Sequence, residues 1–390
     1  MNILKSFENT EVAFKQKSNF QLRKAYLLFQ FFAYTKLMRF ANKVLLKAFK
    51  WHLPIDFLVR KTAFDHFCGG ESIKDCQKAI NNLHASKVGT ILDYSVEGKE
   101  EDTYFDATTK EIIATIKEAA TQRDKIPFSV FKVTGLAPFS LLEKVNSKQI
   151  LNAEEEKEYI QVKRRIDAIC QEAHKNHVKL LIDAEESWIQ DAIDALTNEM
   201  MEKYNKEEAI VYNTLQMYRH DRLAYLQNDI AIAKEKNYKL AYKIVRGAYM
   251  EKERARALAH SYVSPIQIDK THTDNDYNQA LEICINQGIA ICAGTHNEKS
   301  AAFLAEQILA KNIAPNDARF YVAQLLGMSD HISCNLASQG FCVAKYVPYG
   351  PVREVMPYLI RRAEENTSVA GQTSRELDLI QKEIKRRKNN

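Results

Sequence analysis

The chain has 390 residues, a length that suits one large domain with an appendage. Apolar residues make up 46% and charged residues 27%, so the chain can bury a sizeable core. Glycine (12) and proline (8) are scarce, which favours long helices and argues against collagen-like or disordered chains. No glycine spacing gives G-x-G-x-x-G or G-x-x-x-x-G-K, so Rossmann and P-loop nucleotide binding are excluded.

Cysteine usage and the N-terminal residues predict a compartment. The seven cysteines are scattered and never spaced C-x-x-C, which is typical of a reducing compartment without disulfides or zinc fingers. The first residues do not read as a signal peptide, and Glu8 and Glu11 argue against a transit peptide. We therefore expect a cytoplasmic protein. No H-x-H pair ends a predicted strand, so we expect no metal site and no metal-dependent hydrolase.

The first 67 residues are basic and aromatic. They hold twelve Lys or Arg against four Asp or Glu, and their aromatic residues include Phe29, Phe31, Phe32, Tyr34, Phe40, Phe49 and Trp51. Such helices either pack on the main domain or lie on an anionic membrane surface, and the two interpretations are compatible. A non-enzymatic membrane scaffold would explain this segment alone. The basic run 385–388 predicts a solvated helix end, and we expect no nucleic-acid binding.

From residue 88 onward, short β-rich runs alternate with longer helical patterns such as 154–176 and 219–237. We predict eight strands, at 90–96, 128–134, 178–184, 210–217, 241–247, 289–294, 319–326 and 342–348. This alternation predicts an α/β fold, a (β/α)8 TIM-type barrel preceded by an N-terminal helical arm. An open doubly wound sheet is the less favoured alternative. The expected divisions are an arm with a lead-in helix (1–87), the barrel (88–370) and a C-terminal helix (371–390).

Polar residues interrupt several predicted strands near their carboxyl ends. They are Lys132, Asp183, Gln216, Lys243, Arg246, Thr295, His296 and Tyr346. A single residue of this kind is most often a core polar group with satisfied hydrogen bonds. Because barrel active sites gather at the carboxyl ends of the strands, so many together predict a site there.

A polar stripe follows the last predicted strand, at the helical spacing that normally faces the core. Its members are Tyr358, Arg361, Arg362 and Glu365. Two adjacent arginines suit bidentate capture of a carboxylate, and the glutamate one turn later can hold them in place. Pro351 or Pro357 could begin the helix and add its positive N-terminal end to this anion site. The alternative is an outward-facing ion-pair surface.

Seven segments together resemble the proline dehydrogenase family of flavin enzymes. They are FKVTGL (131–136), LIDAEES (181–187), TLQMYRHD (214–221), KIVRGAYMEKE (243–253), AGTHN (293–297), KYVPYG (345–350) and YLIRRAEEN (358–366). Their order and spacing follow the family across the whole barrel. Residues 1–67 also look like the arm of monofunctional members, and the chain is too short for the aldehyde dehydrogenase module of the bifunctional bacterial enzymes.

The resemblance implies oxidation of L-proline to Δ1-pyrroline-5-carboxylate, with electrons passed to a membrane quinone by a protein peripheral to the cytoplasmic face of the inner membrane. Arg361, Arg362 and Lys132 would clamp the substrate carboxylate, and Asp183 would hold Lys132 charged and oriented. Glu365 would pair with the arginines. The wall around the ring would be Tyr249, Leu325, Tyr346 and Tyr358. Members that favour hydroxyproline tend to lack the strand-eight tyrosine, so Tyr346 favours proline as the substrate.

The resemblance also implies FAD, bound without covalent attachment across the barrel. Lys243 would stand beside flavin N5, where some members have arginine. Lys270 and Thr273 would lie on a loop, 267–277, that contacts the ribose and pyrophosphate. Met250 stands where the bifunctional branch has tryptophan. The complete set of implied cofactor contacts is Asp183, Ala184, Gln216, Lys243, Val245, Gly247, Ala248, Tyr249, Lys270, Thr273, Thr295, His296 and Asn297.

A second enzyme class stays open on the residues alone. A barrel aldolase would use Lys132 or Lys243, both on predicted strands, to form a Schiff base with a carbonyl substrate. It would be colourless, whereas a flavin enzyme is yellow. For the flavin reading the sequence offers no strong candidate for a dedicated base, so solvent would take the proton of the proline amine.

Overall fold

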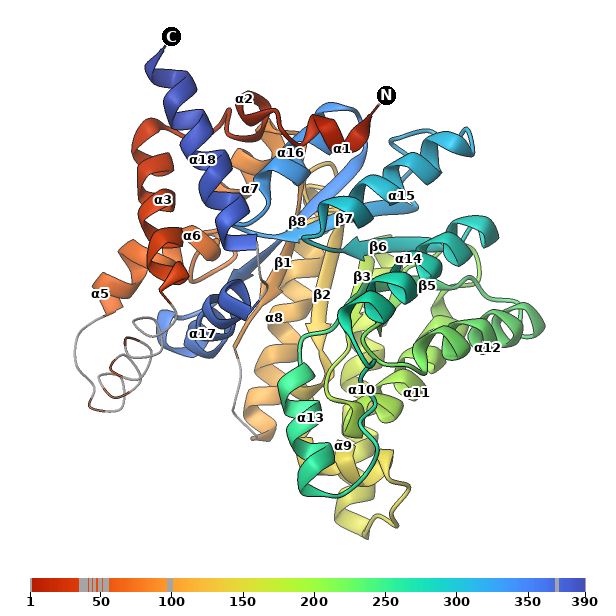
Figure 1. Cartoon of the computed structure of the whole chain (residues 1–390). Helices are drawn as coiled ribbons and strands as arrows, with labels where there is room; N and C mark the ends of the chain where they lie inside the picture. Colours follow the sequence, from red (N-terminus) through yellow and green to blue (C-terminus); the bar gives the residue numbers. More distant parts are fainter. Residues whose placement is uncertain are drawn as a thin grey trace. The chain divides into compact units, whose positions relative to one another are not determined.

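Eight parallel strands form a closed barrel whose strand order follows the sequence. The computed structural model describes residues 2–34, 41, 44, 47, 51, 56–96, 101–368 and 372–389 (Figure 1). The strands are β1 (Gly89–Tyr94), β2 (Phe128–Lys132), β3 (Lys179–Asp183), β4 (Val211–Gln216), β5 (Ala241–Val245), β6 (Ala290–Gly294), β7 (Phe320–Leu325) and β8 (Cys342–Tyr349). The predicted barrel and all eight predicted strands are confirmed, each to within a few residues.

The strands could be found in the sequence because a parallel sheet covered by helices buries both of its faces. All six residues of β4 are buried, and three buried or half-buried aromatic residues meet inside the barrel. Phe128 packs edge-on against both Tyr212 and Tyr321, with ring centroids 5.5 and 4.9 Å apart. Such pairs add about 0.5–1.5 kcal/mol each to the burial of their area.

Helices alternate with the strands, as predicted. They are α8 (Asp102–Thr121), α9 (Phe139–Asn146), α10 (Ala153–Lys175), α11 (Ser187–Tyr204), α12 (Arg222–Glu235), α13 (Met250–Ala259), α14 (Lys270–Gln287), α15 (Glu298–Ala310), α16 (Asp330–Ser338), α17 (Val352–Ser368) and α18 (Gln372–Lys388). Helix α10 begins with a capping box between Asn152 and Glu155. Helix α14 ends at Gly288, which has the left-handed conformation common after helices.

The chain forms two compact units, residues 98–323 and residues 1–97 with 324–390. In the second unit the N-terminal arm contains α1 (Ile3–Ser6), α2 (Thr10–Ala13), α3 (Asn19–Ala33), α5 (Asp56–Val59), a π-helical turn (Arg60–Phe64), α6 (Asp65–Phe67) and α7 (Gln77–Ala85). Phe29 and Phe32 of α3 are buried in one apolar cluster with residues of α17 and α18. Burial of each ring stabilises the unit by about 2–3 kcal/mol. The packing role predicted for the arm is therefore observed.

An ion triad fixes the start of α16, which follows β7, within this same unit. Asp330 pairs with Lys345 of β8 at 2.7 Å and with Lys17 of the arm at 2.5 Å. Burial alone would raise the pKa of Asp330, but the two lysine charges outweigh it and hold that pKa well below its ordinary value. The arm is therefore joined to strand β8 by charge as well as by apolar packing.

Some predicted residues cannot be placed. Phe40 and Phe49, and the side chains of Arg361, Arg362 and Glu365, lie outside the described residues. Among the residues that are described, no helix combines the length and apolar character needed to cross a membrane.

Candidate active site at the strand ends

One carboxylate joins two lysines at the carboxyl ends of the strands. Asp183, at the end of β3, is paired in register with Lys132 of β2, and its Oδ2 lies 3.1 Å from the Lys132 Nζ. Its Oδ1 lies 2.6 Å from the Nζ of Lys243, which stands on β5. Because β3 and β5 are not neighbours, the Asp183 and Lys243 side chains meet inside the barrel. The sequence led us to expect the first pair and missed the second.

The electrostatics of this triad favour a charged Asp183. Burial would raise the pKa of Asp183, but the positive charges of Lys243 and then Lys132 outweigh it, so the pKa lies below its ordinary value. Two ammonium groups face one carboxylate, so these three side chains together carry one net positive charge. This is an environment that attracts an anionic group.

A second carboxyl group, which the sequence analysis did not select, lies on the same edge. Glu185 is 3% exposed, and its carboxylate accepts hydrogen bonds from the backbone N–H and the hydroxyl of Thr134. Burial raises the pKa of Glu185 to about 7, against those hydrogen bonds and the charge of Lys132. Its signal in the sequence was the second acidic residue in the strand-end segment LIDAEES.

Gln216, at the end of β4, connects the segments that follow β3 and β5, the two strands on either side of β4. Its amide nitrogen donates to the carbonyl oxygen of Glu185 at 2.6 Å, and its amide oxygen accepts from the Ala248 N–H at 3.2 Å. Gln216 is 3% exposed, so both bonds are shielded from water. The predicted cofactor contacts Gln216 and Ala248 are thus brought together.

Arg246 forms the centre of a polar network that follows β5. Its guanidinium donates to Asp274 at 2.6 Å, to the Thr295 hydroxyl at 2.9 Å and to the Ser300 hydroxyl at 2.8 Å. It also stacks 4.4 Å from the centre of the Tyr277 ring. Sequence reasoning placed Arg246 at a strand end but did not find Ser300, which lies 54 residues further along the chain.

The segment 267–277 was predicted to be a loop that contacts the ribose and pyrophosphate, but most of it is helical. Residues from Lys270 onward form the first turns of α14, because the Asp269 side chain caps the helix through the His272 N–H. The Thr273 hydroxyl is turned to the Asp269 backbone carbonyl, and Lys270 pairs with Asp274 on the helix surface. Lys270 therefore reaches the Arg246 network, through the same aspartate.

Three further predicted cofactor residues follow β6. The Thr295 hydroxyl accepts hydrogen bonds from Arg246 and from the Asn297 backbone N–H, and Asn297 caps α15 through the Lys299 and Ser300 N–H groups. His296 between them is half-buried. The segment AGTHN therefore forms a rigid connection between β6 and α15.

Of the two prolines expected to begin the helix after β8, Pro351 is confirmed and Pro357 is not. Helix α17 begins at Val352, directly after Pro351, and Pro357 lies inside it. The positive end of the helix is thus nine residues, or about 14 Å, from Arg361. Tyr358, which was expected in the wall around the substrate ring, is 6% exposed and belongs to the apolar cluster of the arm. Leu325 packs against the same cluster, and Tyr346 is 7% exposed on β8.

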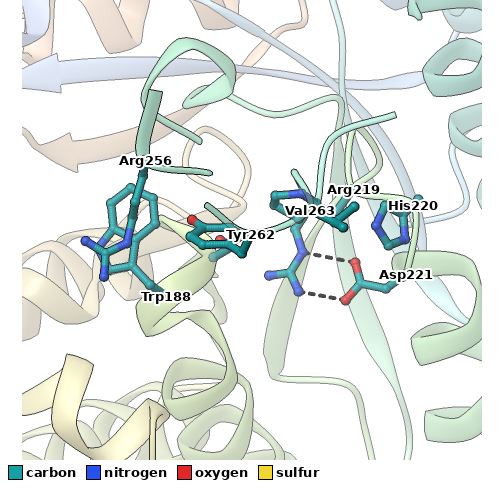
Figure 2. A pocket seen from close by; sticks show the side chains of 9 residues that line it. Trp188, Arg219, His220, Asp221, Arg256, Tyr262 and Val263 are labelled. Atoms are coloured by element: carbon teal, nitrogen blue, oxygen red, sulfur yellow. Dashed lines mark hydrogen bonds and ion pairs between the residues drawn. The ribbon is translucent and has the colours of Figure 1, made fainter. Parts of the chain in front are cut away.

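A cavity of about 480 Å³ lies beside the β4 strand end, within residues 98–323 (Figure 2). Its lining residues are Ser187, Trp188, Arg219, His220, Asp221, Arg256, Tyr262, Val263 and Pro265. None of the residues predicted for substrate or cofactor lines it. Across the described residues, no group of three or more His, Cys, Asp or Glu could hold a metal ion.

A (β/α)8 barrel with cationic and amide side chains gathered at its strand ends defines a barrel enzyme. Residues 76–375 match the family model described as proline dehydrogenase, and the chain belongs to this family, whose members are FAD-dependent oxidoreductases. The chain is 35% identical over 382 residues to "Proline dehydrogenase 1, mitochondrial" from Dictyostelium discoideum, covering 86% of this chain and 66% of that relative.

The chain is also similar to two other proteins. The chain is 33% identical to the "Carbapenem antibiotics biosynthesis protein CarD" from Pectobacterium carotovorum, covering 82% of this chain and 83% of the relative. The fold matches proline utilization A from Bdellovibrio bacteriovorus with a TM-score of 0.72 at 17% identity, over 94% of this chain and 40% of that one. At 17% identity the structural match shows the fold alone.

Proposed function

We propose that this chain oxidises L-proline to Δ1-pyrroline-5-carboxylate with bound FAD and passes the electrons to a membrane quinone. The observation that carries the proposal is the Asp183 bridge between Lys132 and Lys243. The family resemblance assigns one lysine to the substrate carboxylate and the other to flavin N5. A single carboxylate orients both.

The residues around Gly247 fit a flavin nucleotide. Gly247 has φ +132°, and a Cβ there would lie 2.5 Å from the Tyr218 ring, so only a glycine lets the backbone run as it does. The Ala248 N–H is held by Gln216, and the nearby Arg246 guanidinium supplies positive charge for a phosphate. The remaining proposed contacts are Asp183, Ala184, Lys243, Val245, Tyr249, Lys270, Thr273, Thr295, His296 and Asn297.

Substrate binding rests on the carboxylate. Arg361 and Arg362 clamp it in this proposal, with help from Lys132, and Glu365 orients the arginines. Two guanidinium forks and an ammonium hold a small substrate by its one anionic group. Positioning of this kind is the largest catalytic contribution we assign to the chain itself. The ring is enclosed by Tyr249, Leu325, Tyr346 and Tyr358.

The chemistry follows from that placement. Bound FAD would supply the acceptor for the hydride that leaves C5 of proline. The proline amine gives its proton to solvent, and Lys243 places a positive charge where the reduced cofactor is anionic. The aldolase alternative needs a neutral lysine amine, whereas both candidate lysines lie within ion-pair distance of Asp183.

The test is a spectrum of the purified protein. We expect a yellow protein with flavin absorbance, and bleaching of that absorbance when L-proline is added without oxygen. A colourless protein that borohydride traps covalently with a carbonyl substrate would reject the proposal and restore the aldolase.

We also propose that the arm contacts an anionic membrane through α3. Three side chains at seven-residue spacing, Phe20, Leu27 and Tyr34, are 65–76% exposed, while the opposite face of the helix is buried. Arg23 is exposed near them, and α3 has no acidic residue. A surface helix that is apolar on both faces and carries positive charge suits a lipid surface.

Point variants on this outer face test the contact, because removing the arm would expose its buried core. Flotation with vesicles that contain anionic lipid should be reduced by Leu27→Glu and unchanged by Ile150→Glu, which alters an equally exposed apolar residue outside the arm. Equal flotation of all three proteins would assign the arm to packing alone.

A further inference from the structure

The cavity of Figure 2 has the size and lining of a small-molecule site. Its volume of about 480 Å³ lies within the range of ligand pockets. One side is formed by Trp188 at the start of α11 and by Arg256 of α13, the other by residues that follow β4. Trp188, Tyr262, Val263 and Pro265 give the lining its apolar and aromatic surface, and five polar or charged side chains complete it. Such a lining suits a ligand with a flat ring and polar atoms at fixed places.

Arg219, which lines this cavity, holds a buried donor that has no partner among the described residues. Arg219 is 6% exposed, and its Nε and Nη2 donate to the two oxygens of Asp221 at 3.0 and 2.6 Å. The third nitrogen, Nη1, is buried and has no hydrogen-bond partner among the described residues. It points away from the Asp221 carboxylate in Figure 2. A buried donor of this kind is costly unless a ligand oxygen completes it.

Aromatic side chains give the cavity a flat wall. The Arg256 guanidinium stacks 4.5 Å from the Trp188 ring, and Arg256 is held in place by an ion pair with Glu143. Tyr262 stands between this stack and Arg219 in Figure 2. Indole and phenol rings favour a planar, conjugated ligand. An oxygen that accepts a hydrogen bond from Arg219 Nη1 would therefore belong to a planar ring system.

The rim of the cavity is apolar and exposed. Val263, which lines the cavity, is 89% exposed, and the nearby Leu258 and Ile268 are 85% and 80% exposed. Exposed apolar side chains of this kind are typical of an interaction site, and Val263 places one of them at the cavity. An aliphatic tail attached to the planar ring would be covered by these side chains.

The cavity also adjoins the proposed flavin site. Tyr218 directly precedes Arg219, and its ring packs against Gly247, the glycine at the centre of the proposed cofactor contacts. The Tyr218 carbonyl accepts a hydrogen bond from the Gln267 N–H at 2.7 Å, which ties the rim segment to β4. One residue thus separates the two sites.

We propose that this cavity binds the headgroup of a quinone, with a ring carbonyl oxygen accepting a hydrogen bond from Arg219 Nη1 and the tail lying on the apolar rim. The inference rests on the proposed function, for which it supplies the second substrate site. Overall, two electrons and two protons leave proline, and the quinone takes up two electrons and two protons to become a quinol. Atoms and electrons therefore balance without a further reactant.

Trp188 makes binding measurable without turnover. The chain has two tryptophans, so Trp51→Phe leaves Trp188 as the single reporter. In flavin-loaded protein of this background we expect saturable quenching by decylubiquinone and by the tail-less ubiquinone-0. Arg219→Met should raise the Kd of both quinones by roughly 10- to 100-fold, because a charged hydrogen-bond donor is lost. Arg222 still pairs with Asp221 in this variant, which keeps the loop neutralised.

A variant at the rim distinguishes binding of the quinone headgroup from binding of its tail. Val263→Glu should raise the Kd of decylubiquinone by about 3- to 10-fold and leave the Kd of ubiquinone-0 unchanged. The matched variant Ile150→Glu, at another exposed apolar residue, should change neither Kd. Absence of saturable quenching, or equal affinity in Arg219→Met, would overturn the quinone site. A protein whose flavin is not bleached by proline would instead reject the proposed function, and the quenching titration remains readable in that case.

Discussion

Replacement of Glu185 by glutamine should remove a specific pH dependence of stability. Glu185 is 3% exposed, and burial raises its pKa to about 7 from an ordinary value of 4.5. The folded protein therefore favours the protonated form. The stability that this proton contributes is complete below pH 4.5 and is lost as the pH rises through 7. Glutamine is uncharged at every pH and resembles the protonated acid in shape.

The size of the effect follows from the displacement of the pKa. A difference of about 2.5 units corresponds to about 3 kcal/mol when fully developed. Between pH 5 and pH 8 the free energy of unfolding of the wild type should fall by about 2–3 kcal/mol relative to that of Glu185→Gln. Urea unfolding of both proteins with excess FAD measures this difference, because the other titrating groups are common to both.

The exposed Glu207, on the loop after α11, provides the control. Glu207→Gln should follow the wild-type stability at every pH. If the free energies of unfolding of the wild type and Glu185→Gln change in parallel with pH, the reasoning is refuted. That result would mean that burial does not destabilise the charged form of Glu185. A variant that is more stable at pH 8 and no more stable at pH 5 would support it.

Three further perturbations test other parts of the molecule. Arg361→Met should lower kcat/KM for proline by about 30- to 1000-fold, because a contact to a buried carboxylate contributes about 2–4 kcal/mol; near wild-type kinetics would remove Arg361 from the clamp. Gly247→Ala should abolish flavin binding, because its Cβ would lie 2.5 Å from an aromatic ring, whereas Gly340→Ala, which meets nothing within 4 Å, should retain the flavin absorbance. Lys17→Met should lower the free energy of unfolding in urea by about 1–3 kcal/mol, since Asp330 loses one of its two lysine partners, and an unchanged midpoint would show that the pair contributes nothing.

The barrel was predictable because its signal is local. Each strand is a short apolar run that needs no knowledge of its partners, and helical periodicity marks the segments between. Helix boundaries were less predictable where two signals compete. Pro351 and Pro357 both read as helix starts, and only the fold shows that the second lies inside α17. Asp269 read as a loop residue, although its side chain caps α14.

The site was predictable as a set of residues and not as a set of contacts. Strand-end position selects Asp183 and Lys243 from the sequence, but their pairing joins residues 60 positions apart. The same holds for the bond from Arg246 to Ser300, which depends on how β5 and α15 meet. Glu185 was missed because a buried carboxyl group with a raised pKa is defined by its surroundings, and the sequence gives no measure of burial at a strand end.

The shared carboxylate has a consequence for how the two halves of the proposed site act together. Asp183 forms ion pairs with both Lys132 and Lys243, so the two lysines share this carboxylate. Two charges 4 Å apart near a protein surface interact by about 4 kcal/mol. When the substrate carboxylate binds Lys132, it competes with Asp183 for that ammonium group. Asp183 therefore pairs more strongly with Lys243. A change of charge on the substrate side is thus felt on the flavin side through one residue, without any movement of the strands that carry the three groups.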